Sequence, residues 1–465
     1  MTNIKIGNNE VIHFIGIGGI GMSGLAQIMK IMGFNVQGSD VSQGKNIENC
    51  KKVGVRTFVG HNRKNILNAT IIVKSTAITK NNIELIEAKK KKLPTYERAE
   101  MLANIVSLKK NIIVTGSHGK TTTTSLIAKI LSAAKLDPTI INGGVINSIK
   151  SNAKFGKGEW AVLEADESDG SFLKLPINYS VVTNIDNEHL DFYKNYKNLK
   201  KAFTTFINKT PPIGKSIVCL DDKDLKKILR ESKIKNYLTY GINKKSNYQI
   251  LNSKHKLGKT CFDLKIKIQG SKTKKVKNIV LNLIGRHNIL NSTAAIAVCL
   301  NLGIKINIIK KALRNFSGVQ RRLTKIFVKN KKEFYDDYAH HPTEIIAVLD
   351  GLKKVYKKRK IISIFQPHRY SRIKNLKLEF AKSFSLADVV VLCPIYAAGE
   401  KKDVKYSQIN FSKLISKFSK VQVINIRDEI ELKKYLQKNL INDEVVVGMG
   451  AGSISKWMRG LRHTL

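Results

Sequence analysis

112-IIVTGSHGKTTTT-124 joins a short apolar run to a glycine-containing turn and then to a helical pattern that continues to about Ala134. A short apolar run followed by such a turn and a helix is typical of the parallel α/β unit. Gly116, Gly119, Lys120 and Thr121 form a shortened phosphate-binding loop, G-x-x-G-K-T, because Val114 stands where the standard pattern has glycine. Backbone amides of such a loop surround phosphates, its lysine neutralises them, and its threonine can bind Mg²⁺. The segment therefore predicts an α/β fold that binds ATP.

The same pattern occurs once before this segment and once after it. Residues 11–15 read as a buried strand and precede 16-GIGGIGMSG-24, and a third start follows 316-FSGVQRRL-323. Further strands are predicted at 35–38, 71–74, 160–165, 179–184, 361–365, 389–392, 421–426 and 444–447, with a hairpin region within 245–280. A length of 465 residues suits two to four domains. We expect three α/β domains, at residues 1–108, 109–320 and 321–465.

The first glycine cluster has the G-x-G-x-x-G spacing at Gly16, Gly18 and Gly21, and Asp40 follows 19 residues later at the end of the next strand. Glycines at these positions allow backbone amides to approach a pyrophosphate at a helix N-terminus. The motif alone fits NAD as well as a UDP-sugar. An NAD-dependent dehydrogenase is therefore an alternative, although it leaves the phosphate loop without a role.

Acidic and imidazole side chains follow two predicted strands of the middle segment. Glu164 begins the acidic stretch of 163-LEADESDGSF-172, and Asp186 and His189 lie in 183-TNIDNEHLDFY-193. Carboxylate and imidazole groups close to a triphosphate can hold Mg²⁺. Together with the phosphate loop, they predict an ATP–magnesium site.

The composition is strongly basic, with 82 Lys and Arg residues against 35 Asp and Glu residues and a formal net charge of +47. A basic surface can bind nucleic acid through its phosphates, and a nucleic-acid-binding ATPase is a second alternative. The lysines are spread along the whole chain, however, and no zinc-finger, RNP-type or basic-zipper motif accompanies them. We therefore expect a general enrichment in lysine and no specific nucleic-acid partner. A pure binding module is disfavoured because it needs no magnesium-binding residues.

Cysteine usage and hydropathy bear on the compartment. The five cysteines are scattered without a C-x-x-C pair, which disfavours zinc and disulfides and suits a reducing cytosol. The first ten residues, MTNIKIGNNE, are polar and not typical of a signal peptide, and no run of 18 apolar residues occurs. We expect a cytoplasmic protein without membrane insertion. The oligomeric state is not predicted.

Three more polar clusters occur in the second half of the chain. In 285-GRHNILN-291, Asn288 and Asn291 are three residues apart on one helical face and suit either adenine recognition or helix capping. In 336-DDYAHHPTE-344, two adjacent histidines suggest metal binding or acid–base chemistry. In 365-FQPHRYSR-372, arginines after a strand suit carboxylate or phosphate recognition.

Taken in order, these motifs and the final 448-GMGAGS-453 resemble the Mur ligases over about residues 11 to 456. The resemblance implies an N-terminal Rossmann-like UDP-binding domain, a central phosphate-loop ATPase domain and a C-terminal Rossmann-like domain that binds the amino acid. GIGGIGMSG is more similar to members that add L-alanine to UDP-N-acetylmuramic acid than to members that re-attach a recycled tripeptide. That activity is the first amino-acid addition in peptidoglycan precursor synthesis, and its implied route is an acyl phosphate formed with ATP and Mg²⁺.

The resemblance also implies roles for individual residues. The implied ATP-binding set is Gly116, Ser117, His118, Gly119, Lys120, Thr121, Thr122, Asn288, Asn291 and Arg321. The implied UDP-substrate set is Gly18, Gly19, Gly21, Met22, Ser39, Asp40 and, with less similarity, Ser75. Thr121, Glu164 and His189 are the implied metal ligands, and Lys120 the implied catalytic lysine. His340, Arg369 and Arg372 are expected around the lactyl carboxylate and the incoming alanine. Either His340 or Asp337 could be the base that deprotonates the amine.

Overall fold

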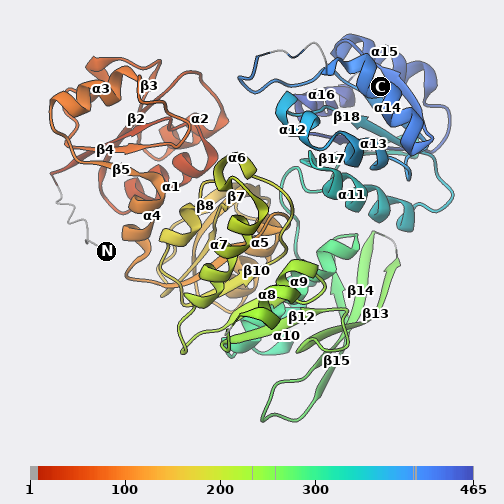
Figure 1. Ribbon diagram of the computed structural model, residues 1–465, viewed down its shortest axis with the longest axis horizontal. Helices are drawn as coiled ribbons and strands as arrows, with labels where there is room; N and C mark the ends of the chain where they lie inside the picture. Colours follow the sequence, from red (N-terminus) through yellow and green to blue (C-terminus); the bar gives the residue numbers. More distant parts are fainter. Residues whose placement is uncertain (1–8, 233, 257, 402, 404–405, 464–465) are drawn as a thin grey trace. The chain divides into compact units, whose positions relative to one another are not determined.

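The computed structural model describes residues 9–232, 234–256, 258–401, 403 and 406–463 (Figure 1). The prediction about the amino-terminal segment therefore lies largely outside the described residues. By the density of its contacts the chain divides into two compact units. One comprises residues up to 252 with 262–280 and 290–317, and the other comprises 253–261, 281–289 and 318–465. Within the described part of the chain, no helix has both the length and the apolar character needed to cross a bilayer.

The first sheet has the strand order β3-β2-β1-β4-β5, and each of its neighbouring strands is parallel to the next. The chain reverses its direction across the sheet between β1 and β4, and ligands of open α/β sheets bind at the carboxyl ends of strands at such a switch point. The strands are β1 Val11–Ile15, β2 Asn35–Asp40, β3 Arg56–Val59, β4 Ile71–Lys74 and β5 Thr95–Glu97, and the helices are α1 Ile20–Ile31, α2 Lys45–Lys52, α3 Ile83–Lys90 and α4 Arg98–Val106.

The second sheet has the order β15-β14-β13-β12-β11-β10-β6-β9-β7-β8. Strand β6 is parallel to both of its neighbours, β9 and β10, so the carboxyl ends of these three strands share one edge. The strands are β6 Lys110–Thr115, β7 Thr139–Ile146, β8 Ser151–Lys154, β9 Trp160–Glu164, β10 Tyr179–Val182, β11 Ser216–Cys219, β12 Tyr237–Gly241, β13 Tyr248–Lys256, β14 Lys259–Ile266 and β15 Lys274–Leu281. The helices are α5 Lys120–Ala133, α6 Leu190–Tyr193, α7 Tyr196–Asn208, α8 Lys223–Glu231, α9 Arg286–Asn301 and α10 Ile306–Arg314.

The third sheet has the order β16-β17-β21-β18-β19-β20, and β16 alone is antiparallel to its neighbour. Strands β17, β21 and β18 lie side by side in parallel, with Asp337 opposite Met449 and Met449 opposite Phe365. The strands are β16 Thr324–Lys329, β17 Lys332–Asp337, β18 Ile361–Phe365, β19 Val389–Leu392, β20 Gln422–Asn425 and β21 Val445–Met449, and the helices are α11 Pro342–Val355, α12 Tyr370–Asn375, α13 Lys377–Lys382, α14 Gln408–Ser419, α15 Glu429–Asn439 and α16 Ile454–Gly460.

The central strands of each sheet are apolar on both faces because helices cover both faces. The side chains of β18, 361-IISIF-365, are all buried, and so are those of β19, 389-VVVL-392. Such continuous runs gave the strand predictions, which match β1, β4, β18 and β19 at both ends. The α/β fold class with three sheet-containing domains is confirmed. The exact domain boundaries stay predictions, although 108 lies between α4 and β6, and 320 between α10 and β16.

Candidate active site

The phosphate loop lies at the carboxyl end of β6, between the ends of β9 and β10. Register places Val114 opposite Glu164 on one side and Thr115 opposite Val182 on the other. The loop needs glycine at two points, since Gly116 has φ +129° and Gly119, the N-cap of α5, has φ +85°. Left-handed backbone of this kind is open to glycine at no steric cost. The loop amides therefore precede a helix N-terminus, where anions bind.

Lys120 makes several contacts within this loop. Its Nζ donates to the carbonyl oxygens of Gly116 at 2.6 Å and Ser117 at 3.1 Å, and to Glu167 Oε1 at 3.0 Å. Burial alone would lower the pKa of Lys120, but the carboxylates of Glu167 and Asp166 outweigh it and raise the pKa above the usual value. The lysine is therefore a fixed cation with an anionic partner. Glu167 was visible in the sequence only as one of several acidic residues, and nothing singled it out.

Thr183 and Asn184, which follow β10, support the loop from the side opposite Glu164. Asn184 Oδ1 accepts from the His118 amide at 2.8 Å, and Asn184 Nδ2 and Thr183 Oγ1 both donate to the His118 carbonyl. His118 Nε2 lies 3.0 Å from Asp186 Oδ2. Sequence reasoning missed Thr183 and Asn184, because polar residues after a strand are common and only the pairing of β10 with β6 gives them this position.

Two groups of oxygen and nitrogen donors lie beside the loop. Thr121 Oγ1 donates to Glu164 Oε1 at 2.9 Å, and Glu164 Oε2 accepts from the amide of Gly143. Separately, Glu167, Glu188 and His189 each place one ligand atom within 4.8 Å of the others. Burial alone would lower the pKa of His189, but its hydrogen bond to Glu167 and the negative charges of Glu167, Glu188 and Asp166 together raise that pKa. The predicted metal ligands thus fall into two neighbouring sets that share the acidic segment after β9, and Glu188 joins them.

The first glycine cluster follows β1 and contacts the ends of β2 and β4. The Ser39 carbonyl accepts from the amides of Gly16 at 2.9 Å and Ile17 at 3.0 Å, and Asp40 Oδ2 accepts from the Gly18 amide at 2.8 Å. A Cβ added to Gly16 would lie 3.2 Å from Ser75 Cβ, so the segment after β4 reaches the same loop.

The remaining members of this predicted set lie around the start of α1. A Cβ on Gly21 would lie 3.3 Å from the side chain of Arg98, and a Cβ on Gly19 would lie 3.8 Å from Met22. Met22 is 2% exposed, and it therefore contributes chiefly to the core. The predicted UDP-substrate residues are thus brought together at the switch point of the first sheet.

Asn288 and Asn291 lie on α9 and are both nearly buried. A Cβ on Gly119 would come within 2.5 Å of Asn291 Oδ1, so Asn291 lies against the phosphate loop. The amide nitrogen of Asn288 donates instead to the carbonyl of Ile284 at 2.7 Å. The geometry therefore supports a nucleotide contact for Asn291 more directly than for Asn288.

In the second compact unit, candidate residues gather at the carboxyl ends of β17, β18 and β21. His340 and His368 have ring centroids 5.8 Å apart, and His368 stacks on Tyr396. Arg372 Nη1 lies 3.1 Å from His368 Nδ1, and Arg369 has φ +71° with its amide donating to the Tyr396 carbonyl.

Arg321 lies at the same sheet edge of this unit. Its guanidinium donates to the Gly450 carbonyl at 2.5 Å and lies over the Tyr338 ring, 4.6 Å from the centroid. Burial lowers the pKa of Arg321, with partial compensation from the charge of Asp336. The arginine therefore fastens β21 and its turn in this structure, and its predicted contact with ATP stays a prediction.

The two candidate bases differ in their surroundings. Asp337 Oδ1 accepts from the Ala339 amide at 2.7 Å and Oδ2 from the Leu323 amide at 2.6 Å, and burial raises the pKa of Asp337 to about 7. His340 Nδ1 lies 2.8 Å from the Tyr338 carbonyl, and burial lowers the pKa of His340 to about 3. A carbonyl only accepts, so Nδ1 carries the proton and Nε2 is unprotonated. Asp337 therefore holds the backbone, while His340 presents an acceptor.

The neutral histidines of this unit predict acid lability. Burial, reinforced by Arg372 and Arg369, lowers the pKa of His368 to about 4, and burial lowers that of His340 to about 3. In an unfolded chain both titrate near 6.5, so between pH 6.5 and 4 the unfolded state binds more protons and stability falls as the pH falls. Asp337 acts in the opposite direction, because its raised pKa makes the folded state bind more protons between pH 7 and 4, and it does so equally with or without His368. We therefore expect the urea midpoint of His368→Asn to fall less between pH 6.5 and 4 than that of the wild type. If the urea midpoint depended on pH equally in the wild type and in His368→Asn, this account would be contradicted.

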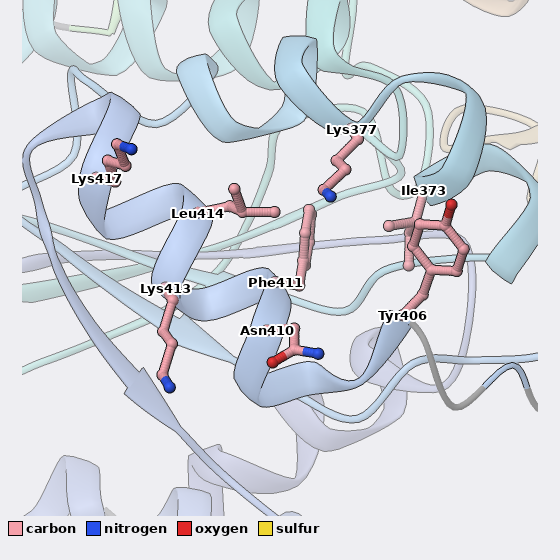
Figure 2. A pocket seen from close by; sticks show the side chains of 8 residues that line it. All are labelled: Ile373, Lys377, Tyr406, Asn410, Phe411, Lys413, Leu414 and Lys417. Carbon is pink, nitrogen blue, oxygen red and sulfur yellow. The ribbon is translucent and has the colours of Figure 1, made fainter.

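A separate hollow of about 310 Å³ lies between α13 and α14 (Figure 2). Apolar side chains form its floor and three lysines stand on its rim; it is lined by Ile373, Lys377, Tyr406, Asn410, Phe411, Lys413, Leu414 and Lys417. None of the predicted site residues lines it. The hollow therefore does not belong to the candidate site.

Comparison with known proteins assigns all three segments to one family. Residues 11–110 match the model described as Mur ligase family, catalytic domain, residues 114–299 match Mur ligase middle domain, and residues 321–452 match Mur ligase, glutamate ligase domain. A UDP-N-acetylmuramate–L-alanine ligase of Pelagibacter ubique is 58% identical over 98% of this chain and 99% of its own length. The ligase of the same name from Brucella anthropi is 42% identical over 98% of each chain. A crystal structure of a UDP-N-acetylmuramate-alanine ligase from Thermotoga maritima superposes with a TM-score of 0.82 at 28% identity, covering 97% of this chain and 98% of that one.

Proposed function

Because this chain belongs to the Mur ligase family, we infer that it joins L-alanine to the lactyl carboxylate of UDP-N-acetylmuramic acid in a reaction driven by ATP. The observation that carries this assignment is the 58% identity to the Pelagibacter ligase over nearly the full length of both chains. The geometry supports it with a glycine loop at the switch point of the first sheet, a phosphate loop with acidic neighbours and a histidine–arginine cluster.

The chemistry requires that the carboxylate be activated before the amide forms. An oxygen of the lactyl carboxylate attacks the γ-phosphorus of ATP, the bond to the β-phosphate oxygen breaks, and an acyl phosphate and ADP result. Both reactants are anions, so fixed positive charge at the loop is the main contribution of the protein. We propose that Lys120 and the amides following Gly116 supply this charge.

In the second step the neutral amine of L-alanine attacks the acyl carbon, the carbon–oxygen bond to phosphate breaks, and the amine loses a proton. We propose that Arg369 and Arg372 orient carboxylate groups through their fork geometry. We propose His340 Nε2 as the acceptor of the departing proton because it is unprotonated, although burial lowers the pKa of His340 to about 3 and so makes it a weak base. Asp337 positions the backbone around it, since both of its oxygens already accept amide hydrogens.

The donor set beside the phosphate loop fits Mg²⁺, because carboxylate and hydroxyl oxygens predominate and His189 adds one imidazole. We propose that Thr121 and Glu164 hold one ion, and that His189 with Glu167 or Glu188 holds another. Bound Mg²⁺ would neutralise phosphate charge during transfer. Without ATP, the carboxylates of Glu164, Glu167 and Glu188 give the region beside the phosphate loop a negative charge, and Lys120 partly neutralises that charge.

His189→Ala is expected to raise the Mg²⁺ concentration needed for half-maximal activity, by about tenfold for loss of one of several ligands. The measurement is a Mg²⁺ titration of ADP formation at saturating substrates. His255→Ala is the matched control, because His255 lies outside the predicted site and pairs with Thr260. An unchanged titration for His189→Ala would argue against ligation.

The assignment is tested by ADP release with ATP and Mg²⁺ while UDP-N-acetylmuramic acid or L-alanine is omitted in turn. Release that requires both, with a product heavier by one alanyl residue, is the expected result. ADP formation that ignores both substrates, rises with nucleic acid and falls steeply with salt would instead favour a basic ATPase. We further propose that the enzyme works in the cytoplasm without a specific nucleic-acid partner.

A further inference from the structure

A buried carboxylate in the first sheet's domain collects an unusual number of hydrogen-bond donors. Glu84, in the first turn of α3, is fully buried. Its Oε1 accepts from the Asn62 amide at 3.1 Å and from Asn65 Nδ2 at 2.7 Å. Its Oε2 accepts from Ser39 Oγ at 2.5 Å and lies 3.4 Å from His13 Nε2 and 3.3 Å from His61 Nδ1. Burial would raise the pKa of Glu84, but these hydrogen bonds lower it to about 2, so the group is a carboxylate that only accepts.

The donors and acceptors fix the protons on the two histidines. Gln37 Nε2 donates to the Asn65 carbonyl at 2.9 Å, which identifies it as the amide nitrogen, and it lies 3.2 Å from His13 Nδ1. His13 Nδ1 therefore accepts, and its Nε2–H donates to Glu84.

For His61 the same accounting gives the opposite tautomer. Ser39 gives its hydroxyl proton to Glu84, so Ser39 Oγ can only accept from His61 Nδ1, which lies 3.0 Å away. His61 Nδ1 must carry a proton, and in the neutral ring Nε2 is left as an acceptor. Among the described residues Nε2 has no hydrogen-bond partner, and the His61 side chain is 14% exposed.

The His61 ring contacts Ser39, a residue whose backbone also holds the glycine loop. The Ser39 carbonyl accepts hydrogen bonds from the amides of Gly16 and Ile17. The Asp40 carbonyl accepts a hydrogen bond from the Gly60 amide at 2.7 Å. The loop that carries His61 is therefore tied to the same two residues at the end of β2 that hold the glycine loop.

We propose that His61 is a further substrate-binding residue, whose Nε2 accepts a hydrogen bond from the nucleoside part of the UDP-substrate, and that Glu84 is its positioning residue. The inference rests on the proposed function, which places this substrate on the first sheet. Phosphates offer no donor at neutral pH, whereas ribose hydroxyls and the uracil imide do, and UDP as the probe separates these donors from the hydroxyls and the acetamido N–H of the amino sugar. Because His61 already carries its proton on Nδ1, binding of the substrate requires no transfer of a proton between the two ring nitrogens.

The primary variant is His61→Asn, whose amide can keep the bond from the Nδ1 position while removing the atom at Nε2. With UDP as the probe in calorimetry, we expect about tenfold weaker binding, as for one lost hydrogen bond. The KM for UDP-N-acetylmuramic acid should rise similarly, with unchanged kcat, KM for ATP and urea midpoint. His255→Asn is the matched control and should leave UDP binding unchanged.

The protonation of the two His61 ring nitrogens can be measured directly. If His61 had only a structural role, adding UDP would not change the signal of its Nε2. Long-range ¹H–¹⁵N spectra of the full chain with labelled histidine should show His61 protonated at Nδ1 and bare at Nε2, with the Nε2 signal shifting when UDP is added. Glu84→Gln should weaken UDP binding at least as much and abolish this fixed tautomer. UDP binding of wild-type strength by His61→Asn, or a proton on Nε2 in the free protein, would overturn the inference and leave the ligase assignment intact. Failure of wild-type protein to bind UDP would overturn both.

Discussion

Lys120→Ala lowers kcat by about 100-fold or more, the loss expected when one preorganised charge-stabilising group is removed from a site of phosphoryl transfer. The reason is the position of the ammonium, which is held at 2.6 Å and 3.1 Å by two loop carbonyls and at 3.0 Å by Glu167. Such fixed charge needs no reorganisation when the γ-phosphoryl moves. Single-turnover measurement of ADP formation with all substrates bound isolates this step from product release.

Lys129→Ala is a suitable control for this experiment. It lies on the same helix, α5, outside the predicted set of ATP-binding residues. It should keep full activity. A Lys120→Ala enzyme within threefold of wild type would remove Lys120 from the chemical step.

Gly116→Ala is expected to lower the free energy of unfolding by about 3 kcal/mol or more and to abolish measurable ATP binding. Two costs add at this position. Alanine at φ +129° is strained by about 1–3 kcal/mol, and forcing a methyl group into a filled space costs about 1–3 kcal/mol more. The added Cβ would overlap Thr183 Oγ1 and would lie 3.0 Å from backbone atoms of Asn184, which cannot move without releasing the loop.

Gly303→Ala separates the two costs. Gly303 also has a left-handed backbone, φ +79°, but a Cβ there meets no atom within 4 Å. This variant should lose only about 1–2 kcal/mol for the conformational strain and bind ATP normally. Urea unfolding and calorimetric ATP titration of both variants provide the comparison. Equal losses in the two proteins would show that the crowding around Gly116 has no consequence.

The sequence predicted those parts of the fold that local patterns encode. Continuous apolar runs such as 361-IISIF-365 located the buried parallel strands, and the glycine-containing turns located the loops. Several strands escaped prediction, including the interior strands β7, β11, β12 and β17, of which β11 is buried along its whole length. Edge strands escaped as well. Strand β8, 151-SNAK-154, and β3, 56-RTFV-59, lack both an apolar run and a strict alternation, and only pairing with a neighbour makes them strands.

At the candidate site, the sequence identified several functional side chains but not the residues that they contact. Lys120, Glu164 and His189 stood out because they follow a phosphate-loop pattern or a predicted strand. The pairing of Lys120 with Glu167, and the convergence of Ser39, His61 and Glu84, join segments 22 to 47 residues apart. Contacts of this kind depend on strand order and on the depth to which a helix packs, which no local spacing reports. The roles of the individual site residues stay predictions until the variants are measured.

The close pairing of Lys120 with Glu167 has a thermodynamic consequence for ATP. When ATP binds at this loop, one of its phosphates must replace the Glu167 carboxylate as the ion-pair partner of Lys120. The observed affinity then reports the difference between two favourable ion pairs, and only a ligand that also engages the loop amides gains from the exchange. Inorganic phosphate should therefore compete poorly. Glu167→Gln, by removing the resident anion, should bind phosphate more tightly while turning over ATP more slowly.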